Sequence, residues 1–295
     1  MCARGFIKVK DRMSSALDDF AQRALDWIDR HRNAFRLVGE GQERLLRIKR
    51  LAELGLVATA ASERSLLAAD LADFAWQELG RGAEIGDTLY QTPALAVAYL
   101  PFRLTGRRSA ELEARLAAAE WRADWRQWPG FVRYANGCVL ESIGVPIPWS
   151  QSAEQAGLEM FTTQVSQRFA VQAEVSAHVV LWRTHFGRYP AALSPDELAS
   201  LGLWVSTAVA TLTAHGLLDP LAEVLAANAS ADGSSHDDAW QPLFDAQRRD
   251  GAVPVRVGEN SESFVDLYHS TLAATLAASL CATTKEMRRW FDVRV

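Results

Sequence analysis

Helical periodicity repeated along nearly the whole chain is the feature that most limits how this protein can fold. Apolar residues recur at intervals of three and four, and each stretch stops near a glycine or a proline. In the first stretch, Ser14 or Ser15 is placed to cap a helix that carries Phe20, Trp27 and Ile28. The chain of 295 residues therefore predicts an all-α protein of about a dozen helices joined by short connections.

The helix boundaries follow from caps and breakers. Gly80 is expected to end the third helix, Pro101 the fourth, and Ser109 to cap the fifth. A strand-like alternation at 253–257 contains Pro254 and predicts at most an edge strand or hairpin arm. After the first helix, the predicted segments are 42–59, 66–79, 91–99, 109–125, 130–142, 151–167, 168–186, 195–215, 217–228, 237–249 and 261–282.

Two arrangements suit so many helices: a solenoid of helix pairs, or pairs closed into an α/α toroid. A solenoid shows self-similarity at a fixed period, and this chain has none. The pattern favours a closed double-layer helical barrel whose inner helices are buried on most sides. We expect 168–186, 201–215 and 261–282 to be inner helices of a single domain, 1–295, with a polar loop near 228–238.

Composition excludes several classes of partner. The net charge of −5 and the scattered arginines give no electrostatic case for nucleic acid. No signal peptide is visible, and no uncharged apolar run reaches the roughly 18–20 residues of a membrane span. Three widely spaced cysteines do not form a disulfide or zinc framework. We therefore expect a soluble cytoplasmic protein without membrane or nucleic-acid partners, and a homodimer stays open.

The most informative polar stretch is a stripe on the predicted helix 168–186. At 3.6 residues per turn, Glu174, His178, Trp182 and His185 share an arc about 80° wide. Apolar residues flank this arc, so the pattern predicts an inward-facing polar stripe. Buried imidazoles and carboxylates need hydrogen-bond partners, water or a ligand.

Two further histidines lie on apolar faces. His269 shares an arc with Leu272 and Leu276, and His215 shares one with Trp204 and Leu212. Each of the four is either a core histidine bonded to a nearby backbone group or part of a site at which they converge. The sequence leaves both interpretations open.

If they converge, the spacing argues against a metal centre. His178 and His185 are two turns, about 10.5 Å, apart along one helix, too far to ligate one ion easily. We predict neither a metal nor a cofactor. Acid–base catalysis suits the residues better: His178 would act as acid or base, Glu174 would orient it, and His185 and His269 would be further proton donors. The substrate would lie against Trp182, Tyr268 and His215.

Two segments, Thr184-His185-Phe186-Gly187 and Leu267-Tyr268-His269-Ser270-Thr271-Leu272, resemble those of an uncharacterised all-helical family from actinobacteria. The resemblance covers about twenty residues of the C-terminal half and implies no activity. It suggests a tailoring role in bacterial natural-product biosynthesis, as a cofactor-independent cyclase, lyase or isomerase acting on a small molecule. The alternative is a helical ligand-binding or protein-interaction scaffold with structural histidines.

Overall fold

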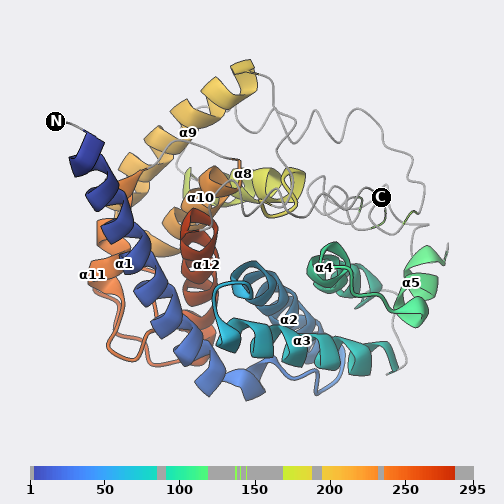
Figure 1. Ribbon diagram of the computed structural model, residues 1–295. Helices are drawn as coiled ribbons and strands as arrows, with labels where there is room; N and C mark the ends of the chain where they lie inside the picture. The colour runs from blue at the N-terminus through green and yellow to red at the C-terminus, as the bar shows by residue number, and fades with distance from the viewer. Residues whose placement is uncertain are drawn as a thin grey trace. The chain divides into compact units, whose positions relative to one another are not determined.

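A computed structural model describes residues 3–84, 91–118, 169–187, 195–231 and 236–282, together with residues 137, 140 and 144. Within these residues the protein has ten α-helices, two short 3-10 helices and no strand, which confirms the all-α class (Figure 1). The helix predicted at 151–167 lies outside the described residues, and of the helix predicted at 130–142 only residues 137 and 140, both helical, are described. The toroidal closure stays a prediction.

The chain divides into two compact units. A terminal unit joins Met1–Arg30 with Gln164–Val295, and a middle unit comprises His31–Thr163. The terminal unit contains α1 (Ala3–Arg30), α8 (Phe169–Arg183), α9 (Pro195–Ala214), α10 (Leu218–Ser230), a 3-10 helix (Asp237–Trp240), α11 (Gln241–Ala246) and α12 (Phe264–Ala282). The middle unit contains a 3-10 helix (Arg32–Phe35), α2 (Gly41–Ala61), α3 (Leu66–Glu84), α4 (Gln91–Leu104) and α5 (Ala110–Ala117).

Small side chains hold the two central helices of the terminal unit together. Helix α12 packs against α1 and α10, and α10 also packs against α8 and α9 (Figure 1). On α12 the hydroxyls of Thr271, Thr275 and Ser279 are buried and bond to carbonyls four residues earlier. Helical hydroxyls satisfied in this way let the backbones approach closely. The contact surface is lined by fully buried alanines, among them Ala222, Ala226, Ala274, Ala277 and Ala278.

The segment that precedes α12 is fixed by hydrogen bonds from side chains. The hydroxyl of Ser270 donates to the carbonyl of Val253 at 2.6 Å, and the Val253 amide donates to Thr271 at 3.0 Å. Gly251 has φ +94°, and a Cβ there would lie 2.0 Å from the carbonyl oxygen of Arg23 on α1. The strand-like alternation at 253–257 forms no strand, and its Arg256 makes an isolated antiparallel bridge with Leu217.

In the middle unit, α2 packs between α3 and α4. Gly55 of α2 leaves room for α4: a Cβ there would lie 3.1 Å from the ring of Phe102 and 3.5 Å from Pro101. Gly82 of α3 similarly makes room for Leu37, whose Cδ1 would lie 2.6 Å from an added Cβ. These glycines permit close packing and do not end their helices.

Three predicted helix ends are wrong. Helix α3 continues through Gly80 to Glu84, and α4 continues through Pro101 to Leu104. Pro101 is buried against Gly55 of α2, so packing offsets its helix-breaking tendency, whereas Gly80 is exposed and a single glycine costs a helix only about 1 kcal/mol. Ser109 does cap α5, because its side chain accepts from the Leu112 amide at 3.3 Å. However, α5 ends at Ala117 and not near Trp125, since Ala118 is extended, with ψ 138°.

Helix α9 was expected to be an inner helix, and this interpretation is wrong. Leu203 is 73% exposed and Leu198 is 42% exposed. After the first turn, the residues of α9 itself are apolar or carry hydroxyls on every face of the helix. Hydrophobic periodicity therefore could not show which face is buried. By length and composition α9 also resembles a membrane span, although core helices of soluble proteins do so too. The expected polar loop at 228–238 begins later, because α10 extends to Ser230.

Candidate functional site

Two carboxylates on α10 form the base of the candidate site. Asp219 and Glu223 are four residues apart on α10, so they lie on the same face of the helix. Glu223 is only 4% exposed, although it belongs to a helix made mainly of alanine, leucine and valine. Buried carboxylates are rare unless they are paired with a cation or hydrogen-bonded. The buried Glu223 carboxylate therefore requires cationic or hydrogen-bonding partners within the unit.

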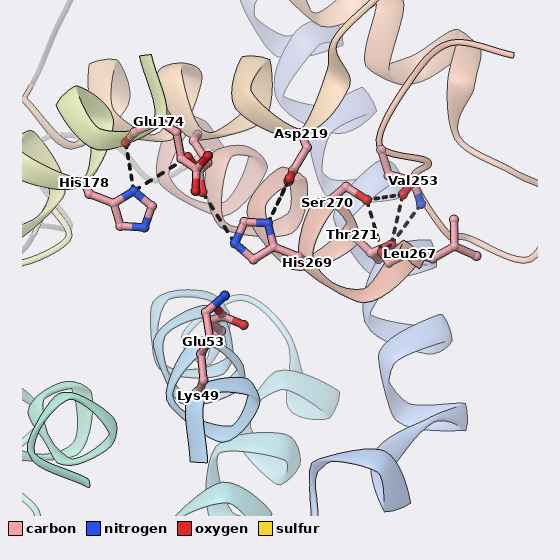
Figure 2. Close-up of polar contacts among 11 residues, drawn as sticks. Lys49, Glu53, Glu174, His178, Asp219, Val253, Leu267, His269, Ser270 and Thr271 are labelled. Atoms are coloured by element: carbon pink, nitrogen blue, oxygen red, sulfur yellow. Dashed lines mark hydrogen bonds and ion pairs between the residues drawn. The ribbon is translucent and has the colours of Figure 1, made fainter. Parts of the chain in front are cut away.

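His269 on α12 lies between these two carboxylates (Figure 2). Its Nδ1 is 2.9 and 3.0 Å from the two oxygens of Asp219, and its Nε2 is 3.5 Å from Glu223 Oε1. An ionised carboxylate only accepts, so the hydrogen of the Asp219 contact resides on Nδ1. These contacts fix the position of the ring, and the His269 side chain, 23% exposed, still reaches solvent.

His178 on α8, labelled in Figure 2, lies near the second oxygen of the same glutamate. Its Nδ1 is 2.8 Å from the backbone carbonyl of Glu174 and 3.7 Å from Glu223 Oε2. The two oxygens of Glu223 thus face two different histidines. The Glu174 side chain is exposed, so its expected inward orientation is wrong, and its backbone rather than its carboxylate contacts His178.

His185 does not continue the predicted stripe, because α8 ends at Arg183. His185 has φ +44° and Phe186 has φ +57°, so the chain makes a left-handed turn there. Such backbone angles are uncommon outside glycine and carry conformational strain. Burial lowers the pKa of the His185 imidazole below its ordinary value. Trp182 is 6% exposed and packs edge-on against Phe186 at 5.0 Å.

The remaining predicted site residues differ in their surroundings. Tyr268 is 9% exposed and stacks on Phe264, with its ring edge-on to His269 at 6.2 Å. His215 was expected on an apolar face, but it is exposed, and its Nδ1 is 2.8 Å from the Thr211 carbonyl. The reason is that α9, which ends just before His215, is itself exposed on most of its surface.

The structure thus brings together His178 and His269, two of the predicted residues, around two carboxylates that sequence reasoning missed. A signal for Glu223 was available, since it is the one charged residue between Pro220 and Asn228. Asp219, four residues earlier, completes the spacing of a helix face. Among the described residues, no group of three or more His, Cys, Asp or Glu side chains could hold a metal ion.

These features define an all-helical protein with a carboxylate–histidine cluster on three packed helices. The chain belongs to a family described as a domain of unknown function, DUF6895, whose model matches residues 21–279. The match covers most of the chain and includes parts of both units. No curated protein and no solved structure matches the chain.

Proposed function

We propose that the terminal unit is an acid–base catalyst with His269 at its centre. The observation that supports this is the position of His269 between Asp219 and Glu223. A histidine exchanges protons near neutral pH, and an adjacent carboxylate fixes its ring and stabilises its cation. The same arrangement of a carboxylate on one ring nitrogen and chemistry at the other recurs in unrelated hydrolases.

The geometry suggests a role for each residue. Asp219 contacts Nδ1 closely, whereas the contact of Nε2 with Glu223 is longer, at 3.5 Å, so Nε2 is the atom proposed to exchange a proton with the substrate. Asp219 is then a positioning residue, and Glu223 stabilises the imidazolium from the Nε2 side. His178, at the other oxygen of Glu223, extends the chain of titratable groups. This proposal moves the central role from His178 to His269, and the orienting role from Glu174 to Asp219.

The reaction class follows from these groups. A histidine with a carboxylate partner supports proton abstraction and return, as in a cyclisation, elimination or isomerisation. Such a reaction on a small, partly apolar molecule needs no cofactor. The resemblance to an actinobacterial family suggests bacterial natural-product biosynthesis in the cytoplasm as the setting. His185, Trp182 and Tyr268 are proposed only as neighbours of the substrate.

One observation favours a second candidate, a ligand-binding or interaction scaffold. His178 and His215 each bond through Nδ1 to the carbonyl four residues earlier, at 2.8 Å. A histidine satisfied by its own helix needs no ligand to explain it. In this alternative the His269 contacts would simply join α12 to α10.

The experiment compares His269→Gln and Asp219→Asn with His215→Gln, a control at an exposed histidine. A library of small, partly apolar compounds is first screened with the wild type for thermal stabilisation and for turnover. We expect all three variants to fold, and turnover to fall about 100-fold or more in H269Q, as loss of a general acid–base group does. D219N should shift the pH profile of the rate, because it removes the partner of Nδ1.

Two results would reject the catalytic role. If H269Q and D219N unfold while H215Q folds, the cluster is a structural clamp and the scaffold interpretation is favoured. If H269Q folds and turns over the screened compound as fast as the wild type, His269 does not carry the chemistry.

A further inference from the structure

A short segment of the terminal unit, residues 253–257, joins the two helices that carry most of the candidate site, and we call it the strap. Its first residue, Val253, is fully buried and meets α12 directly after His269 (Figure 2). The Ser270 hydroxyl donates to the Val253 carbonyl at 2.6 Å, and the Val253 amide donates to the Thr271 hydroxyl at 3.0 Å. Both polar groups of the Val253 backbone are therefore bonded to the two residues that follow His269.

The other end of the strap caps α10. The amides of Leu218 and Asp219 both donate to the carbonyl of Val255, at 2.9 and 3.3 Å. The first amides of a helix have no acceptor within that helix, and the N-cap residue here, Leu217, makes no side-chain cap. The strap thus supplies a backbone carbonyl in place of a capping side chain, and one of the two amides belongs to the residue whose carboxylate contacts His269.

The chain that leads into the strap is held on a third helix, α1. Gln247 Nε2 donates to the carbonyl of Phe20 on α1 at 3.0 Å and to the carbonyl of Gly251 at 3.1 Å. The close approach of Gly251 to Arg23, described above, leaves no room for movement toward α1. The strap therefore starts from a fixed place, and its bonds to α10 and α12 set how these two helices lie relative to each other.

The contact between His269 and Asp219 depends on that relative position. Its distance is 2.9 Å, and a slide of either helix by less than about 1 Å would take it outside hydrogen-bond range. The surface on which α10 and α12 meet is lined by alanines, whose short side chains form shallow ridges and resist such a slide weakly. Bonds to a common segment hold the two helices in register more firmly than this packing.

We propose that the strap positions the catalytic pair, and that Ser270 and Thr271 act through it on the contact between His269 and Asp219. Both hydroxyls are fully buried, so they are positioning residues and do not meet a substrate. The expected effect on turnover rests on the proposed acid–base function. The effect on the His269 ring does not, because it is measured without a substrate.

The test compares Ser270→Ala and Thr271→Val with Thr275→Val in the full chain. Thr275 is the matched control, because its hydroxyl is equally buried and bonds within α12, to the Thr271 carbonyl at 2.6 Å. Hydrogen exchange of the Leu218 and Asp219 amides reports the cap, and the ring ¹⁵N spectrum of His269 reports which nitrogen carries the hydrogen.

We expect S270A and T271V to accelerate exchange of the two amides about fivefold or more, as the loss of a hydrogen bond does. The preference for a hydrogen on Nδ1 of His269 should be lost in the same variants. T275V should match the wild type in both measurements. Thr271→Ser, which keeps the hydroxyl, should restore both.

Turnover gives a third measurement once a compound is found that the wild type converts. S270A should lower kcat about tenfold or more with KM nearly unchanged, because a small misplacement of the reacting groups slows the chemical step. In the Asp219→Asn background, S270A should cause no further loss, since both substitutions act on one contact. Additive losses would indicate a purely structural role for Ser270 and would overturn the proposal.

The remaining outcomes separate the strap from the acid–base function. If S270A and T271V match T275V, or if the amides exchange faster while the His269 ring is unchanged, the strap does not position the pair. An altered ring in S270A together with full turnover in H269Q would support the strap and reject the acid–base function. If S270A does not fold, Ser270→Cys, which keeps a weaker donor, must show both changes in smaller degree, and their absence would reject the proposal.

Discussion

Two polar clusters, one in each unit, use carboxylates in opposite ways. In the terminal unit, Glu223 faces His178 and His269, whose charge changes near neutral pH. In the middle unit, Glu113 faces Arg103 and Arg108, which stay charged at every accessible pH. The first arrangement can pass protons, whereas the second is a permanent ionic contact that ties α5 to α4.

The permanent charges of these arginines shift the pKa values of the groups bonded to them. Hydrogen bonding to Arg108 lowers the pKa of Glu113 below its ordinary value, with a further contribution from Tyr99. Burial and the neighbouring Glu113 carboxylate raise the pKa of Tyr99 to about 12. Both groups are thus fixed in one protonation state at neutral pH, so this cluster contributes stability rather than chemistry.

The largest expected effect comes from removing the carboxylate of the middle unit. Glu113→Ala should lower the free energy of unfolding by about 2–3 kcal/mol, because it leaves the Tyr99 hydroxyl and two guanidiniums without their acceptor. Urea unfolding measures the change. Glu111→Ala on the same helix is the control, since Glu111 is exposed and should change stability by less than about 0.5 kcal/mol. Equal losses of unfolding free energy in the two variants would show that Glu113 does not hold an ionic cluster that Glu111 lacks.

The next effect isolates one hydrogen bond of that cluster. Tyr99→Phe should cost about 1–1.5 kcal/mol, because the fully buried hydroxyl donates to Glu113 and accepts from the Ser109 amide. Urea unfolding again gives the value. In the wild type, the ultraviolet absorbance of one tyrosine should report ionisation only near pH 12. That late absorbance change should be absent from Y99F, and its persistence there would assign it to another tyrosine.

A pH series separates the two units. The folded pKa of His185 lies below 6.5, so its stabilising contribution is present above pH 6.5 and is lost as pH falls from 6.5 through the folded pKa. The folded pKa of Glu113 lies below 4.5, so its contribution persists down to pH 4.5 and is lost as pH falls further. On acidification, the terminal unit should therefore weaken before the middle unit.

Matched variants assign each step of that pH series. His185→Asn removes the imidazole with a residue that tolerates a left-handed backbone, and it should flatten the loss that begins at pH 6.5. Glu113→Ala should flatten the loss that begins at pH 4.5. Hydrogen exchange of amides in α12 and α4 reads the two units separately. If amide exchange in α12 and in α4 accelerates together as pH falls from 6.5, the two units do not differ in their response to acid.

The smallest effect is expected at a surface ion pair of the middle unit. Asp73 pairs with Arg107, but its side chain is 57% exposed. Asp73→Asn should change the free energy of unfolding by less than about 0.5 kcal/mol, because water screens the pair. Arg107 also keeps its contacts with the rings of Trp76 and Phe102. A loss comparable to that of E113A would show that exposure does not distinguish these two carboxylates.

Much of the fold could be predicted because helices are encoded locally. The cap at Ser109 follows from residues within a few positions of that boundary. Helix ends that depend on packing could not be predicted. Gly82 lies against Leu37, which is distant in sequence, and so α3 does not stop where its own glycines suggest.

The candidate site shows the same division between local and distant information. Spacing alone could place His178 and Glu174 on one helix face, and it could place His269 on an apolar face. It could not show that the Glu174 side chain is exposed, nor that the partner of both histidines is Glu223 on a third helix. That pairing depends on how α8, α10 and α12 pack.

By itself, the sequence determined that this chain forms amphipathic and apolar helices, because a period of 3.6 residues is a property of local backbone geometry. It also determined which histidines have apolar neighbours. Only the tertiary structure decided which carboxylates those histidines meet and which apolar helix stays exposed. The physical reason is that charge pairing and burial depend on distances between helices, which a helical period does not specify.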